Sequence, residues 1–153
     1  MATYTSKYTV PTAYLSVPHH GLAENLKVMS ATVAVPTTLA TTDVISFFTM
    51  PKNAKLSSFK IGSDQLDSNG APTLALNVGD ALLATRLFSA VAAGRTAGGS
   101  FVNELTAGAQ YAGVGYQFPT DTLIVASPST ASATGAAGNV TLYVYYTLEG
   151  GAS

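Results

Sequence analysis

The residues best suited to chemistry are oxygen donors in and after a turn-like stretch: Asp64, Asp67 and Asn69, followed by Asp80. Carboxylate and amide oxygens are the ligands that calcium prefers in proteins. The spacing does not match the twelve-residue calcium loop, because the glycine and the downstream acid stand at the wrong positions. Turn formation accounts for Asp67 and Asn69, and capping of the next segment accounts for Asp80. We therefore expect no metal site, and a cation beside this turn is the weaker alternative.

The usual catalytic and cofactor motifs are missing from the sequence. His19 and His20 are adjacent, so on a strand or loop they point apart, and neither a cysteine nor an HExxH motif accompanies them. No G-x-S-x-G elbow occurs, and the glycine-rich run at 97–100 lacks the lysine of a phosphate loop. The eight acidic residues are thinly spread, so two carboxylates flanking a sugar cannot be placed. We expect no catalytic residues, no cofactor and no enzymatic activity.

The charge pattern gives no reason to expect a nucleic-acid or membrane partner. The net charge of −1 creates no field that would steer either one. Lys52, Lys55 and Lys60 lie close together in the sequence, but three lysines without stacked aromatics more often form a solvated face or protect a sheet edge. No apolar run approaches the ~20 residues needed to cross a bilayer, and we expect no secretory signal at the start of the chain.

Composition points to a protein that works in an assembly. The 153 residues suit one domain. Charged residues make up only 10% of the chain, against about 25% in ordinary soluble domains. The surface must therefore consist largely of Thr, Ser, Ala, Gly and Asn, and a nearly neutral surface with few charges tends to associate. Cysteine is absent, which removes disulfides and thiolate chemistry.

Short β-type segments separated by turn residues follow one another from residue 26 onward. Alternation of apolar and polar residues predicts strands at 26–35, 43–50, 55–62, 73–79, 110–118, 122–127 and 139–148. The segment at 122–127 is apolar throughout its centre, which predicts a strand buried on both faces. Leu56 falls out of phase with Phe59 and Ile61, so a β-bulge is expected there. Seven or eight such strands predict an all-β antiparallel β-sandwich, with a jelly roll as the expected strand order.

The same alternation predicts which side chains enter the core. In the segment at 26–35 the inward set is Met29, Ala31, Val33 and Val35. In the segment at 110–118 it is Ala112, Val114, Tyr116 and Phe118. In the segment at 139–148 it is Val140, Leu142, Val144, Tyr146 and Leu148, which is the clearest pattern in the chain.

One segment carries a helical signal. Asp80 is a good N-cap, and Gly94 suits the position just after a helix. Leu83, Leu87 and Val91 recur every four residues between them. The sequence therefore predicts at most one short helix, or a helical loop, at 81–93, inside the β domain.

Residues 1–25 differ from the rest of the chain. Prolines interrupt any helix or central strand, and aromatic and apolar residues are scattered among Thr, Ser and Pro, notably Tyr4, Tyr8, Tyr14 and Leu15. We expect an extended N-terminal arm over 1–25 whose aromatic side chains dock elsewhere, followed by the β-sandwich domain over 26–153. The alternative is a frayed terminus, which is common.

Tyr143 and Tyr145 form a stripe opposite the predicted core face of the last strand. Tyrosine is enriched at interfaces, where an apolar ring meets a wet edge. It also performs well in cross-strand pairs within a sheet. The sequence leaves both interpretations open, and the two tyrosines join the arm residues as candidates for a partner interface.

Several stretches carry a family resemblance. The stretch at 66–80, LDSNGAPTLALNVGD, combines a turn with an alternating strand. TAGG at 96–99, YQF at 116–118 and DTLIV at 121–125 follow it, and then a small-residue linker at 131–138 leads into VTLYVYY at 140–146. In this order, the stretches resemble the decoration (cement) proteins on the heads of tailed bacteriophages. The resemblance covers most of 43–147 and does not include the arm.

The resemblance implies a structural role. It implies a β-rich domain that forms a homo-oligomer, either a dimer or a trimer, and binds the outside of an icosahedral shell at joints between subunits of the major capsid protein. The protein would be made in the host cytoplasm and located on the outer surface of the virion capsid. The chain also looks too short to be the major shell protein itself.

A glycan-binding module is the alternative from another class, because jelly rolls also host lectins. Sugar platforms usually need exposed flat aromatics, often tryptophan, and the chain contains no tryptophan. The virion role is therefore preferred.

Overall fold

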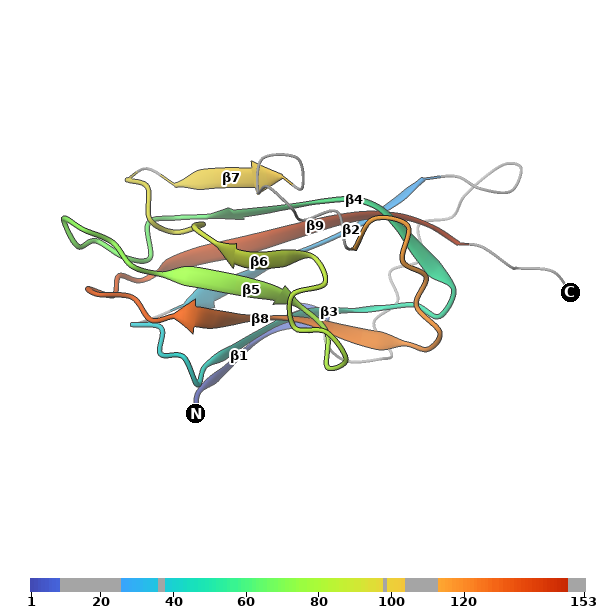
Figure 1. The fold of residues 1–153 in the computed structure, drawn as a ribbon, viewed down its shortest axis with the longest axis horizontal. Coiled ribbons are helices and arrows are strands. Elements are labelled where there is room, and N and C mark those ends of the chain that lie inside the picture. Colours follow the sequence, from blue (N-terminus) through green and yellow to red (C-terminus); the bar gives the residue numbers. More distant parts are fainter. Residues whose placement is uncertain (9–25, 36–37, 98, 104–112, 149–153) are drawn as a thin grey trace, which may run out of the picture.

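The computed structural model describes residues 1–8, 26–35, 38–97, 99–103 and 113–148. Nine strands occur in these ranges: β1 (Thr3–Tyr8), β2 (Lys27–Val35), β3 (Val44–Met50), β4 (Ala54–Ser63), β5 (Ala75–Gly79), β6 (Phe88–Val91), β7 (Ser100–Asn103), β8 (Thr122–Thr130) and β9 (Gly138–Leu148). They form two sheets, with the orders β1-β3-β8-β5-β6 and β2-β9-β4-β7 (Figure 1). The described residues contain no helix, and hence none long and apolar enough to span a membrane. The predicted all-β class is confirmed.

The strands pair in a nested order. β2 pairs with β9, β3 with β8, β4 with β7 and β5 with β6, and all four pairs are antiparallel. Thus the first of these eight strands lies beside the last, the second beside the last but one, and so on inward. β1 stands outside this scheme, because it adds to the edge of the five-stranded sheet by pairing in parallel with β3.

Local alternation predicted the best-formed pair of strands. β2 and β9 pair over nine residues without a register shift. Ala31, Val33 and Val35 of β2 are buried, and Met29 packs against the core. Val140, Leu142, Val144 and Tyr146 of β9 are buried in the same way. These inward faces confirm the prediction, except that Leu148 at the end of β9 is exposed.

The bulge predicted in β4 is present. The register between β4 and β9 shifts between Leu56 and Ser58. The extra residue lets Leu56, Phe59 and Ile61 all point inward, and all three are buried. Phe59 meets Phe88 of β6 edge to face, with ring centroids 5.1 Å apart. Because β4 and β6 belong to different sheets, this contact packs the two sheets against each other.

The helix predicted at 81–93 is wrong. Asp80 does accept hydrogen bonds from the backbone N–H groups of Leu82 and Leu83, as an N-cap would. The chain then closes a turn and returns to the sheet, where the N–H of Leu87 donates to Val78. Residues 88–91 form β6, in which Ala90 has a left-handed φ of 51° that no helix contains. The four-residue spacing of Leu83, Leu87 and Val91 arises from a turn at Leu83 that is followed by the strand β6.

The strand predicted at 110–118 is wrong in its described part. Gly113–Phe118 is a turn with one isolated bridge, from Gln117 to Lys55. Gly115 has a φ of 81° and reverses the alternation, so Val114 is exposed while Phe118 is buried. Ala112 lies outside the described residues.

The prediction that the segment at 122–127, now part of β8, is buried on both faces is also wrong. Ile124 and Ala126 are buried, but Leu123 is 39% exposed. β8 lies inside the five-stranded sheet, and its second face is not covered at Leu123. Leu123 is an apolar residue at an outward position, and a run of apolar residues does not distinguish such a position from a buried one.

A buried carboxylate joins two segments of the loop region. Asp67 is fully buried, and its oxygens accept hydrogen bonds from five backbone N–H groups, those of Asn69, Thr73, Leu74, Ala133 and Thr134, at 2.8–3.3 Å. Burial alone would raise the pKa of this carboxyl group. The backbone donors outweigh burial and hold the pKa well below its usual value. The Asp67 turn is therefore tied to the segment that precedes β9.

We predict that Asp67→Asn destabilises the protein by about 3 kcal/mol, since an amide nitrogen would face backbone donors that now meet an anion. Urea unfolding measures the change. Asp64→Asn is the matched control, because the two hydrogen bonds that the exposed Asp64 carboxylate accepts from described residues both come from Asn139, at a single oxygen, and an amide oxygen can still accept them. Equal stabilities of the two variants would contradict the prediction.

Stability should also fall in acid. The pKa values of Asp43, Asp67 and Asp80 are all lowered in the folded state. A group with a lowered folded pKa contributes its full stabilisation above the unfolded pKa of about 3.9, and loses it as the pH falls toward the folded pKa. Urea midpoints measured from pH 6 to pH 2 should decrease below about pH 4.5, and more steeply in the wild type than in Asp67→Asn. If the urea midpoints of the wild type and of Asp67→Asn fall in parallel as the pH is lowered, Asp67 is not the main source of the acid destabilisation.

Candidate functional site

The predicted tyrosine stripe lies on the outer face of the four-stranded sheet. Tyr143 and Tyr145 are both half-buried, and they alternate with the inward residues of β9. Tyr143 lies between Ser30 of β2 and Lys60 of β4 in the register of the sheet. The structure therefore brings the two tyrosines together on one surface, as the sequence suggested.

Contacts within the sheet occupy part of this surface. The ammonium group of Lys60 lies 4.7 Å from the centroid of the Tyr143 ring, which is cation–π distance. The hydroxyl groups of Thr32 and Thr141 are 2.8 Å apart and share a hydrogen bond. Cross-strand pairing, one of the two interpretations of the stripe, thus takes place at Tyr143. It does not exclude the other, and an interface role for the tyrosines stays a prediction.

The neighbourhood of Tyr145 is more open. Its partners in the register are Val28 of β2 and Ser58 of β4. Val28 is 53% exposed, and Leu26 just before β2 is 60% exposed. We call the surface formed by Val28, Lys60, Tyr143 and Tyr145 the tyrosine face. It offers aromatic rings, one exposed aliphatic side chain, hydroxyl groups and a lysine, which is the mixture found at protein–protein interfaces.

The two arm candidates that the structure describes, Tyr4 and Tyr8, are not part of the tyrosine face. Tyr4 belongs to β1 in the other sheet and packs against the core. Tyr8 ends β1, where its backbone lies opposite Phe48. Tyr14 and Leu15 lie outside the described residues, so their role in an interface stays a prediction, as does the division of the chain at residue 25.

The start of β1 is fastened through Asp43. Its carboxylate accepts hydrogen bonds from the N–H groups of Ala40 and Ala2, each at 3.0 Å. These donors lower the pKa of Asp43. The N–H of Val44 also donates to the carbonyl of Ala2. At least the first residues of the chain are therefore attached to the body.

The oxygen donors considered for a cation have structural partners instead. Five N–H groups surround the Asp67 carboxylate, and Asp64 accepts hydrogen bonds from both nitrogens of Asn139. The side-chain oxygen of Asn69 accepts a hydrogen bond from the N–H of Ala71. Within the described ranges, no three His, Cys, Asp or Glu side chains are grouped as metal ligands.

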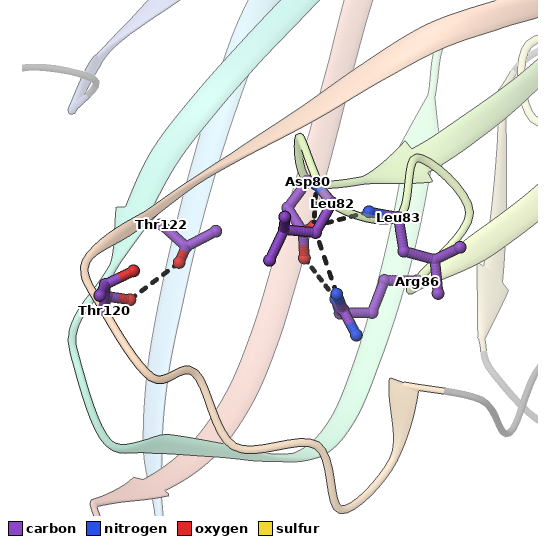
Figure 2. Close-up of polar contacts among 6 residues, drawn as sticks. All are labelled: Asp80, Leu82, Leu83, Arg86, Thr120 and Thr122. Atoms are coloured by element: carbon purple, nitrogen blue, oxygen red, sulfur yellow. Dashed lines mark hydrogen bonds and ion pairs between the residues drawn. The ribbon is translucent and has the colours of Figure 1, made fainter.

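A buried ion pair between Asp80 and Arg86 was not predicted from the sequence. Figure 2 shows the Asp80 carboxylate between the N–H groups of Leu82 and Leu83 on one side and the guanidinium group of Arg86 on the other. The same guanidinium group lies 3.5 Å from the centroid of the Tyr116 ring. Burial acts to raise the pKa of Asp80, but the Arg86 hydrogen bond and the two N–H donors lower it overall. No local pattern pairs Arg86 with a tyrosine 30 positions away.

The ion pair fixes an apolar turn at the surface. Leu82 is 78% exposed and Leu83 is 41% exposed. The turn lies so close to the sheet that a Cβ atom on Gly79 would stand 2.2 Å from the carbonyl oxygen of Leu83. A separate hydrogen bond in Figure 2 joins the Thr122 hydroxyl to the carbonyl of Thr120, at the start of β8. This surface belongs to the other sheet and is separate from the tyrosine face.

Two solved structures of bacteriophage capsids contain chains similar to this one. A chain of the cyanophage Pam1 capsid asymmetric unit is 32% identical, with a TM-score of 0.74, over 93% of this chain and 98% of that chain. A chain of the Ralstonia phage GP4 capsid is 20% identical, with a TM-score of 0.66, over 99% of this chain and 100% of that chain. At 20% identity the likeness to the second chain shows the fold alone.

No family model matches the sequence, and no curated protein does. The relationship therefore depends on the Pam1 capsid chain, whose 32% identity extends along nearly the whole of both chains. Identity at that level over that length identifies relatives. The chain belongs to this family of bacteriophage capsid proteins and is a structural component of the virion.

Proposed function

We propose that the protein decorates the outer surface of a phage head and stabilises the lattice by bridging capsid subunits. The observation that carries the proposal is the match to a capsid chain of nearly the same length, covered to 98%. The fold shared with that chain is a small all-β body, which suits an accessory chain of the capsid. The resemblance of the 66–80 and 140–146 stretches to decoration proteins supports the same role.

The proposed body of this decoration protein is a jelly roll. Without β1, the two sheets have the orders β3-β8-β5-β6 and β2-β9-β4-β7. The nested pairing of the eight strands is what results when one long antiparallel hairpin is folded over into two sheets, which is the jelly-roll arrangement of two Greek keys. The strand order supports this assignment.

The proposed mechanism is thermodynamic. A protein that binds the assembled lattice but not separated subunits stabilises the lattice by its own binding free energy, which is about 2.7 kcal/mol per site at a concentration of 100 Kd. An oligomer that contacts two or more subunits adds avidity without any new kind of contact. No catalytic group is needed for this function.

The tyrosine face is the proposed contact with the shell. Tyrosine binds with a rigid apolar ring and a hydroxyl group that remains able to form hydrogen bonds. Lys60 is the one charged residue of the face, and it already lies over the Tyr143 ring, so burial of the face desolvates a single charge. The half-buried positions of Tyr143 and Tyr145 leave ring surface available to a partner.

Electron microscopy of the purified protein mixed with empty heads of its phage tests the function. The proposal predicts density of jelly-roll size on the outer surface at joints between capsid subunits. Density on the inner surface, or within the tail, would contradict it.

A pair of variants tests the tyrosine face. Tyr143→Ala with Tyr145→Ala should weaken binding to heads by about 30-fold or more, because truncation of even one central aromatic residue of an interface costs about 2 kcal/mol. Co-sedimentation with heads measures the affinity, and thermal unfolding checks that the variant is folded. Leu123→Ala is the matched control, because it removes an exposed side chain from the outer face of the other sheet. An equal loss of affinity for heads in both variants would contradict the assignment of the tyrosine face as the contact with the shell.

A further inference from the structure

The edge of the four-stranded sheet at β2 has backbone groups with which no described residue pairs, and the register identifies them. The N–H of Asp64 donates to the carbonyl of Asn139, and the N–H of Asn139 donates to the Asp64 carboxylate. The backbone groups of Asn139 therefore point toward the β4 side of β9. Because these directions alternate along a strand, those of Val140, Leu142 and Val144 point toward β2.

The residues of β2 divide accordingly. Met29, Ala31 and Val33 lie opposite Val144, Leu142 and Val140, so their N–H and C=O groups bond with β9. The backbone groups of the residues between them must point away from β9. These residues are Val28, Ser30, Thr32 and Ala34, and all four are exposed. We call them the free edge of β2. No described residue forms a backbone hydrogen bond with them.

This edge lacks the usual protection against pairing. Natural edge strands are kept short, bulged, interrupted by proline or marked with charges. β2 is nine residues long, contains no proline and has no register shift, and its one charged residue is the terminal Lys27. The edge strands β6 and β7 have four residues each, and β6 contains the left-handed Ala90. A regular nine-residue edge of this kind can accept an extended strand.

We propose that the free edge of β2 binds β2 of a second copy of this chain in antiparallel orientation. Only one alignment overlaps the whole strand and also brings edge-facing residues opposite each other. It places Ser30 opposite Thr32 of the second copy and Val28 opposite Ala34 of the second copy, with Ala31 on the twofold axis. Each of these pairs exchanges two backbone hydrogen bonds.

The sequence of β2 is complementary to itself in this alignment. Lys27 lies opposite Val35 of the second copy, so the two lysines stand at opposite ends of the joint and do not repel each other. Apart from Met29, which lies opposite Val33 of the second copy, small and β-branched side chains meet along the rest of it, which suits close pairing of strands. A twofold joint of this kind is the commonest symmetry among homo-oligomers. These features favour a second copy over an unrelated strand as the occupant.

The joint would produce a larger contact surface. Two four-stranded sheets become one continuous sheet across the twofold axis. The tyrosine faces of both copies then lie on the same side of that sheet, since Val28 belongs both to the free edge and to the tyrosine face. A dimer built in this way presents two equivalent surfaces to two neighbouring capsid subunits. The inference specifies the homo-oligomer that the proposed function invokes, and its use in bridging rests on that function.

Charge reversal across the joint tests the pairing. Sedimentation equilibrium should give the wild type twice the chain mass of 15.6 kDa. The double variant Ser30→Lys with Thr32→Lys places like charges opposite each other and should weaken dimerisation by about tenfold or more. The double variant Ser30→Lys with Thr32→Asp places opposite charges there and should restore the dimer. This rescue requires that position 30 of one copy faces position 32 of the other.

Each outcome decides the inference. A wild type that stays monomeric or forms a trimer overturns it, and so does a dimer that the two lysines leave unchanged. Loss of the dimer in both double variants overturns the β2–β2 alignment. Amide hydrogen exchange gives a second readout, with slow exchange of the edge-facing amides at positions 28, 30, 32 and 34 in the wild type and fast exchange of these amides in the two-lysine variant, while the amides that bond with β9 stay slow in both. Binding to heads is measured separately, so a dimer that ignores heads would refute the proposed function and leave this inference standing.

Discussion

The fold depends on one buried carboxylate that serves as a joint between distant segments. Asp67 is fully buried and accepts hydrogen bonds from backbone groups of its own turn and from Ala133 and Thr134, more than 60 residues later. An ionised group is costly to bury, so it remains charged only because backbone donors surround it. By joining the turn before β5 to the segment before β9, Asp67 fixes where one interior strand of each sheet begins. The outward faces, including the tyrosine face, follow from that placement.

Much of the fold was readable where the information was local. Alternation along 139–148 identified the core face of β9 and placed Tyr143 and Tyr145 outside it, because side chains of a strand alternate with a period of two. The phase error at Leu56 identified the bulge in β4 for the same reason. The turn chemistry of Asp67 was also recognised. The hydrogen bonds from Ala133 and Thr134 to its carboxylate were not predicted, because no local pattern specifies a partner far along the chain.

The errors arose where two structures share one pattern. Leucines spaced by four residues after Asp80 suit a helix, but they also suit a capped turn followed by a short strand. Leu83 points outward and Ala90 is left-handed, and neither feature is visible in the spacing. The stacking of Arg86 on Tyr116 likewise depends on how the two sheets bring separate loops together. The free edge of β2 needed the pairing register, which sequence alone does not supply.

The proposed function is that a nearly neutral β-sandwich with few charged residues stabilises a larger shell by binding it only when it is assembled. Its central claim is that binding free energy is transferred to the lattice. Heating empty heads with increasing amounts of the protein, while following shell disruption by light scattering, tests that claim most directly. The account predicts that the disruption temperature rises until the sites are filled, and that separated coat subunits bind far more weakly. An unchanged disruption temperature at saturation, or equally tight binding to separated subunits, would contradict it.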